Sequence, residues 1–180
     1  MKKIILSAIV AVCALSANAQ FWGGGRLGFN IIDRDAAPES QMDLTIAPEV
    51  GYTLNENWDV AAALRFETSN NINGTKDRKS TTFAIEPYAR YTFAETGIAK
   101  FFVDGYFNYG KTTEKFPVGA DVKTDVFGIG IRPGVKVALS DDVCIVSTLG
   151  NLGYKNIKDV RNEFGFNVDN AINFGIYFNF

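Results

Sequence analysis

Apolar and polar side chains alternate with a period of two along most of this chain. Between residues 82 and 93, Phe83, Ile85 and Tyr91 share one parity, whereas Glu86 and Arg90 share the other. Successive side chains of a β-strand point to opposite faces, so this pattern indicates strands with one apolar and one polar face. No run of the sequence sustains the period of an amphipathic helix. The chain is therefore predicted to be all-β.

The stretches between these runs alternate in length. Three connections are short, at residues 55–57, 94–97 and 140–142. Four are long, at residues 33–43, 68–80, 111–124 and 155–170. Seven connections join eight strands, and short turns on one rim with long loops on the other are typical of transmembrane barrels. The fold predicted is an eight-stranded antiparallel up-and-down transmembrane β-barrel. The parity of one run, residues 143–154, does not assign its faces.

The first residues have the three-part layout of a secretory leader. Lys2 and Lys3 precede an apolar stretch, 4–15, and Ala17-Asn18-Ala19 supplies small residues for cleavage. The apolar stretch is shorter than the roughly 20 residues of a membrane-spanning helix. We expect residues 1–19 to be a cleaved signal peptide and residues 20–180 to form the barrel domain.

Single charged residues of both signs occur on the polar face, among Gly, Ala and Thr residues. They are Arg26, Glu49, Asp59, Arg65, Glu67, Glu86, Arg90, Lys100, Asp104, Arg132 and Lys136. Six cations thus meet five anions. Such a balanced set suits the narrow lumen of an eight-stranded barrel, where charges must pair. We predict that these residues form an ion-pair network inside the barrel.

Aromatic residues of the apolar face gather near the strand ends, with aliphatic residues between them. They are Tyr52, Trp58, Phe66, Phe83, Tyr91, Phe93, Phe107, Tyr109, Phe127, Phe178 and Phe180. Membrane barrels place aromatic side chains at the two interfaces of the bilayer. Packing in a soluble core does not favour aromatic residues at the strand ends over the strand centres. We predict two membrane-interface belts.

The chain ends in alternating apolar residues with a terminal aromatic: Phe174, Ile176, Phe178 and Phe180. With the preceding pattern, this end resembles the small bacterial outer-membrane β-barrel domains found in outer membrane proteins A and X. The resemblance implies an outer-membrane location in a Gram-negative bacterium. It also implies that these four residues are an assembly signal for the barrel-assembly machinery, and that outer-membrane lipids and lipopolysaccharide surround the protein.

Composition argues against several chemical functions. The chain has no His, which general acid–base and nucleophilic sites use most often. After leader removal Cys144 is its one cysteine, so no internal disulfide is expected. Loss of Lys2 and Lys3 takes the net charge from −2 to −4, and scattered cations offer no nucleic-acid footprint. We predict no metal, no cofactor, no nucleic-acid partner and no enzymatic activity.

The function predicted is an envelope-structural role, a surface-loop adhesion or interaction role, or both. The polar, basic stretch 70–79 could contact lipopolysaccharide phosphates, although a hairpin tip has the same composition. One alternative is a soluble secreted or periplasmic barrel with its apolar faces inward around an apolar ligand. A second is a lipid A-modifying enzyme that uses Glu67 and Glu86.

Overall fold

The protein is described by a computed structural model that covers residues 21–33, 40–71, 79–115, 120–158, 161–167 and 173–180. The predicted signal peptide lies outside these residues, as do residues 34–39, 72–78, 116–119, 159–160 and 168–172, which belong to or adjoin the predicted long connections. Among the described residues, no helix is long and apolar enough to cross a membrane. The strands are β1 (Phe21–Asp33), β2 (Ser40–Thr53), β3 (Trp58–Asn71), β4 (Lys79–Thr96), β5 (Ala99–Lys115), β6 (Val122–Ala138), β7 (Val143–Thr148), β8 (Asn151–Ile157), β9 (Arg161–Asn167) and β10 (Asn173–Asn179).

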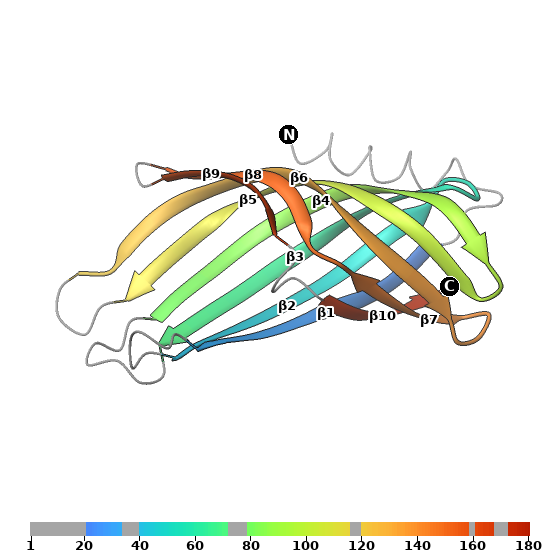
Figure 1. The fold of residues 1–180 in the computed structure, drawn as a ribbon, viewed down its shortest axis with the longest axis horizontal. Helices are drawn as coiled ribbons and strands as arrows, with labels where there is room; N and C mark the ends of the chain where they lie inside the picture. Colours follow the sequence, from blue (N-terminus) through green and yellow to red (C-terminus); the bar gives the residue numbers. More distant parts are fainter. Residues whose placement is uncertain (1–20, 34–39, 72–78, 116–119, 159–160, 168–172) are drawn as a thin grey trace, which may run out of the picture.

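All strand pairs are antiparallel, and the sheet closes on itself (Figure 1). Strands β1 to β6 pair with their neighbours in sequence order, and β10 pairs with β1 on one side and β7 on the other. At the seam, the Phe180 N–H donates to the Phe21 carbonyl oxygen at 2.8 Å. Closure gives the described strands other than β9 hydrogen-bonded neighbours on both sides, as a lipid environment requires, whereas β9 pairs with β8 alone.

Ten strand segments make eight crossings of the barrel. Strands β7 and β8 together form the seventh crossing, because both pair with β6. Strands β9 and β10 form the eighth, because β9 pairs with β8 and β10 pairs with β7. The predicted all-β, eight-stranded antiparallel barrel is confirmed.

The seventh crossing changes parity at its centre. Cys144, Val146 and Thr148 of β7 are buried. In β8, Gly153 lies opposite the inward-facing Gly130, so the odd-numbered residues now point inward. Gly150, with a φ of 65°, separates the two segments. This extra residue is a bulge, which explains why a single parity could not assign the faces of residues 143–154.

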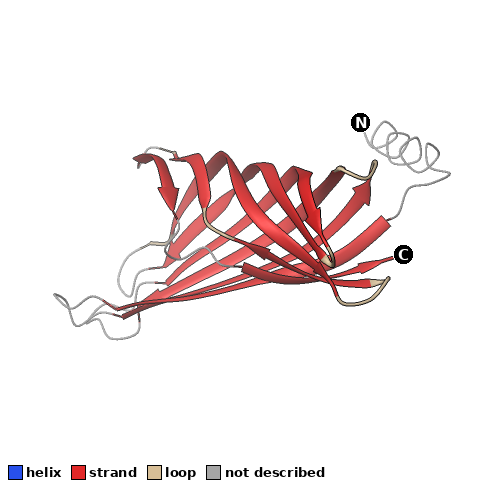
Figure 2. Ribbon diagram, turned by 45° about the vertical axis from the view of Figure 1, so that its right-hand side comes forward, coloured by secondary structure: helices blue, strands red, loops and turns tan. Residues whose placement is uncertain are grey.

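The connections define two rims, seen at opposite ends of the strands in Figure 2. The short-turn rim carries the connections β2–β3, β4–β5 and β6–β7 and both ends of the described chain. The long-connection rim lies at the other end. All four predicted long loops are too long, because the strands that flank them extend further than expected. The loop 155–170 differs most, since it contains the end of β8 and all of β9. In β9 the outward side chains Phe164 and Phe166 alternate with Glu163 and Gly165, a strand pattern that its polar flanks obscured.

Apolar side chains face away from the barrel, and charges face into it. Val50, Leu64 and Ile85 are 66%, 45% and 51% exposed. Glu86 and Asp104, on the inner face of β4 and β5, are completely buried. The soluble alternative required the opposite arrangement and does not fit these faces.

Candidate functional site

Glu86 of β4 is the centre of a charge cluster inside the barrel. Its Oε1 accepts hydrogen bonds from Arg132 Nη1 at 2.6 Å and from Arg26 Nη2 at 2.9 Å. Its Oε2 lies 3.4 Å from Arg65 Nη1. Three strands besides β4 thus supply guanidinium groups to one buried carboxylate, and this ties opposite walls of the barrel together.

Glu49 of β2 holds a second set of contacts beside the first. Arg26 Nε donates to one of its carboxylate oxygens, and the hydroxyl groups of Tyr88 and Tyr177 donate to the other. The Tyr177 bond measures 3.0 Å. Because Arg26 contacts both Glu49 and Glu86, the two sets form one continuous network.

Asp104 of β5 completes the network. Arg90 Nε and Nη2 donate to its two oxygens at 2.7 and 3.0 Å, and Arg132 Nε donates at 3.2 Å. Four arginines, Arg26, Arg65, Arg90 and Arg132, therefore meet three acids. Ionised groups with several charge-assisted partners can remain charged away from water, whereas an unpaired one there is costly.

Aromatic rings fill the space around this network. The Arg90 guanidinium carbon lies 3.8 Å from the centre of the Phe102 ring, and that of Arg132 lies 4.9 Å from the Tyr106 ring centre. The rings of Trp22 and Tyr177 are 4.7 Å apart. None of these inward-facing rings is among the predicted site residues, although their parity matches that of the lumen charges. Together the charges and rings fill this part of the lumen.

The other predicted lumen residues lie outside this cluster. Asp59 accepts a hydrogen bond from Thr53 at 2.7 Å, and Lys100 pairs with Glu95 at 3.0 Å near the short-turn rim. Lys136 takes part in no ion pair found among the described residues. Lys100 and Lys136 lie opposite each other near the strand ends. Because water reaches both side chains there, their charges do not need an ionic partner.

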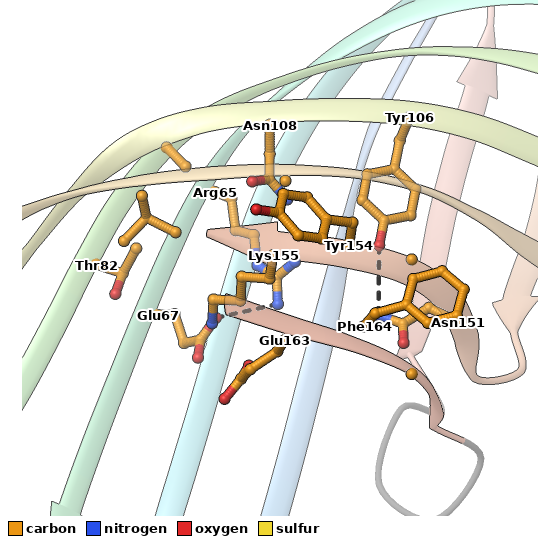
Figure 3. A pocket seen from close by; sticks show the side chains of 15 residues that line it. Arg65, Glu67, Thr82, Tyr106, Asn108, Asn151, Tyr154, Lys155, Glu163 and Phe164 are labelled. Carbon is orange, nitrogen blue, oxygen red and sulfur yellow. Dashed lines mark hydrogen bonds and ion pairs between the residues drawn. The ribbon is translucent and has the colours of Figure 1, made fainter. Parts of the chain in front are cut away.

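Arg65 and Glu67 extend the charges toward the long-connection rim. Arg65 Nη2 lies 3.0 Å from Glu67 Oε2, and both side chains are about one-third exposed. Both residues line a cavity of about 360 Å³, which we call the outer pocket. Figure 3 shows the side chains that line it. Its lining comprises Arg65, Glu67, Thr82, Ala84, Tyr106, Asn108, Val126, Gly128, Asn151, Gly153, Tyr154, Lys155, Glu163, Phe164 and Gly165.

Ring pairs lie at two heights on the outer face. Trp58 lies opposite Tyr91 with ring centres 4.9 Å apart, and Phe66 lies opposite Phe83 at 5.0 Å. Eight residues separate the two pairs along each strand, which corresponds to about 26 Å. Between them β3 presents Val60, Ala62 and Leu64. With strands tilted by about 35–45°, this spacing corresponds to about 20 Å along the barrel axis, somewhat less than the roughly 25 Å apolar band of a membrane barrel.

The remaining predicted belt residues also lie on the outer face. Phe107 and Phe127 form a third ring pair at 5.0 Å, toward the long-connection rim. Tyr109, Phe93, Phe178 and Phe180 are 52%, 59%, 47% and 83% exposed. Tyr52 is 8% exposed, and the edge of the Phe21 ring packs against it at 5.0 Å. Phe174 and Ile176 of β10 likewise face outward.

Comparisons with known proteins agree with this geometry. The family model for the outer membrane protein beta-barrel domain matches residues 4–180. Neisserial surface protein A is 17% identical, with a TM-score of 0.58 over 91% of this chain and 99% of that one. A major outer membrane protein from Thermus thermophilus is 10% identical, with a TM-score of 0.54 over 91% of this chain and all of that one. A search of curated protein sequences finds no match.

Proposed function

The chain belongs to the outer membrane protein beta-barrel domain family, and we propose that it is a non-enzymatic barrel that reinforces the envelope and presents its long connections for contact. Its location is the outer membrane. The proposed role needs a stable barrel wall without an open channel. It also needs long connections on the rim that faces the outside of the cell.

The observation that carries this proposal is the filled lumen. Glu86, Asp104 and Arg90 are at most 1% exposed, and aromatic rings close around them. In a barrel of eight strands, side chains of this size leave no continuous water path. The filled lumen therefore argues against transport of the kind that porins perform. It favours a role in which the long connections make contacts outside the barrel.

The long-connection rim supports the contact role. In this family the longer connections face the outside of the cell. Residues 72–78, which contain Lys76 and Arg78, lie outside the described residues, and Lys79 begins β4. A basic segment at this height would meet the phosphates of lipopolysaccharide, and salt would weaken such a contact.

The lipid A-modifying alternative has less support. Glu86 is completely buried and engaged by three arginines, so no substrate reaches it without breaking the network. Glu67 lies against Arg65. Both carboxylates have a structural explanation as partners of guanidinium groups.

Planar-bilayer recording tests the proposed role directly. The purified, folded protein should give no stable conductance steps at moderate voltage, and a variant with two network charges removed, Glu86→Ala with Arg132→Ala, should give more frequent openings. Large, long-lived steps from the unchanged protein would contradict a filled lumen.

The contact role needs a separate measurement. Lys76, Arg78 and Lys79 should be replaced with Gln, and binding of the folded protein to lipopolysaccharide-containing vesicles compared with binding to phosphatidylcholine vesicles. We expect the triple variant to bind lipopolysaccharide-containing vesicles more weakly than the unchanged protein does, and with less dependence on salt. Its binding to phosphatidylcholine vesicles should be unchanged. A matched variant replaces Lys100 and Lys136, at the opposite rim, with Gln and should bind as the unchanged protein does. Unchanged binding by the triple variant would remove this segment from the proposal.

A further inference from the structure

The outer pocket is a cavity that the lumen network does not fill. It lies between the network and the long-connection rim, and strands β3, β4, β5, β6, β8 and β9 all contribute to its lining. Its volume of about 360 Å³ is at the small end of the range of ligand sites. Figure 3 shows polar side chains from several strands gathered around it.

A row of glycines on three adjacent strands keeps this space open. Gly153 of β8 lies opposite Gly130 of β6 on one side and Gly165 of β9 on the other. A Cβ at Gly130 or Gly153 would lie 2.8 or 3.1 Å from the Tyr106 hydroxyl, so these two glycines make room for that ring. A Cβ at Gly165 would meet nothing within 4 Å. The space beside Gly165, which lines the outer pocket, is therefore open.

The charged groups of the pocket balance each other. Two cations, Arg65 and Lys155, accompany two anions, Glu67 and Glu163. Arg65 bridges Glu67 and Glu86, and Lys155 lies opposite Glu163 across β8 and β9. An ionic ligand would have to compete with these internal partners, whereas a neutral one would leave them in place.

Neutral hydrogen-bonding groups complete the lining. Asn108 and Asn151 each carry an amide that can both donate and accept, and Thr82 adds a hydroxyl group. The Arg65 Nε–H is buried and has no hydrogen-bond partner. A planar guanidinium, carboxylate or amide group can make two parallel hydrogen bonds. Such a group can therefore bind two neighbouring hydroxyl groups of one ligand molecule.

We propose that the outer pocket binds a neutral saccharide of one or two sugar units, through Arg65, Asn108 and Asn151. The sugar could be free or part of lipopolysaccharide, and both sources present the same hydroxyl chemistry. This inference does not depend on the contact role of the long connections.

Nuclear magnetic resonance of the full mature chain in phospholipid nanodiscs tests the inference. The probes are glucose, N-acetylglucosamine and maltose, with the zwitterion alanine as a comparison. We expect at least one saccharide to shift the side-chain signals of Arg65 Nε–H, Asn108 and Asn151 in a saturable way, at millimolar concentration. Alanine should leave them unchanged. No saturable shift with any saccharide, or an equal shift with alanine, would overturn the proposal.

Two matched pairs of variants locate the binding. Gly165→Leu fills this open space and should weaken binding at least tenfold, whereas Gly105→Leu, at an outward glycine that also has open space beside it, should not. Asn108→Ala should weaken binding, whereas Asn156→Ala, an amide on the outer face of β8, should not. If Gly165→Leu does not fold, the Asn108 pair decides. Equal binding by Asn108→Ala and Asn156→Ala would overturn the assignment.

Nanodiscs with and without lipopolysaccharide distinguish the two sources. If lipopolysaccharide supplies the sugar, its presence should shift the same three signals and prevent the free saccharide from doing so. If the natural ligand is a free saccharide, the titration should be the same in both kinds of nanodisc.

Discussion

Arg90 and Asp104 lie directly opposite each other on β4 and β5, and their side chains join inside the barrel through two parallel hydrogen bonds of 2.7 and 3.0 Å. Arg132 donates to the same carboxylate from β6. Three consecutive strands are thus connected by one buried acid in addition to their backbone hydrogen bonds.

Loss of the Asp104 charge should destabilise the barrel. Asp104→Asn preserves the shape but leaves Arg90 without an ionic partner in a buried site, and breaking such a pair typically costs about 3–5 kcal/mol. Urea unfolding in lipid vesicles measures the free energy of unfolding. The control, Glu95→Gln, removes a pair with Lys100 whose side chains are 54% and 40% exposed, and should cost less than about 1 kcal/mol. Equal losses would show that the network does not stabilise the fold.

Two glycines of β5 should respond differently to the same substitution. A Cβ at Gly110 would lie 2.2 Å from the Phe83 carbonyl oxygen, whereas one at Gly105 would meet nothing within 4 Å. Gly110→Ala should therefore lower the free energy of unfolding by about 1–3 kcal/mol, and Gly105→Ala should leave it nearly unchanged. A comparable loss in both variants would show that the close approach at Gly110 is not its cause.

The two tryptophans should report opposite sides of the wall. Trp58 is 43% exposed on the outer face, whereas Trp22 is 3% exposed inside. In vesicles of lipids with brominated acyl chains, the variant Trp22→Phe should show strongly quenched fluorescence from Trp58. The variant Trp58→Phe should be quenched much less. The reverse order would mean that the two faces are exchanged.

The terminal aromatic residue should matter more for insertion in cells than for stability. Phe180 is 83% exposed, so Phe180→Ala removes little packing. We expect a lower amount of the variant in the outer membrane, with unchanged refolding of the purified chain into detergent. Phe93→Ala, which removes another exposed ring near the short-turn rim, is the control. Equal amounts of both variants in the membrane would argue against an assembly signal.

Alternation predicted the architecture well, because the two faces of a membrane strand meet such different surroundings. The runs that form β2, β3 and β4 show Leu64 and Ile85 outside and Glu86 inside, as their parity predicted. The parity argument failed at the bulge beside Gly150, where one extra residue exchanges the faces of β7 and β8. Periodicity carries no sign of such a shift unless its position is already known.

The lumen was harder to predict than the wall. Parity placed Arg26, Glu49 and Glu86 inside, but pairing between distant strands depends on barrel closure and on side-chain length. The parity of Phe102 matches that of the lumen charges, but the space that its ring fills, like the open space beside Gly165, is defined by residues on other strands.

The protein is a closed barrel in the outer membrane, with its apolar face toward lipid. Gel electrophoresis of the outer-membrane fraction, with and without boiling in detergent, tests this arrangement most directly. Closure between β1 and β10 leaves detergent few free strand edges at which to begin unfolding, so the unboiled protein should migrate as a compact species and shift on boiling. Identical mobility in both samples, with the protein in the soluble periplasmic fraction, would contradict the account.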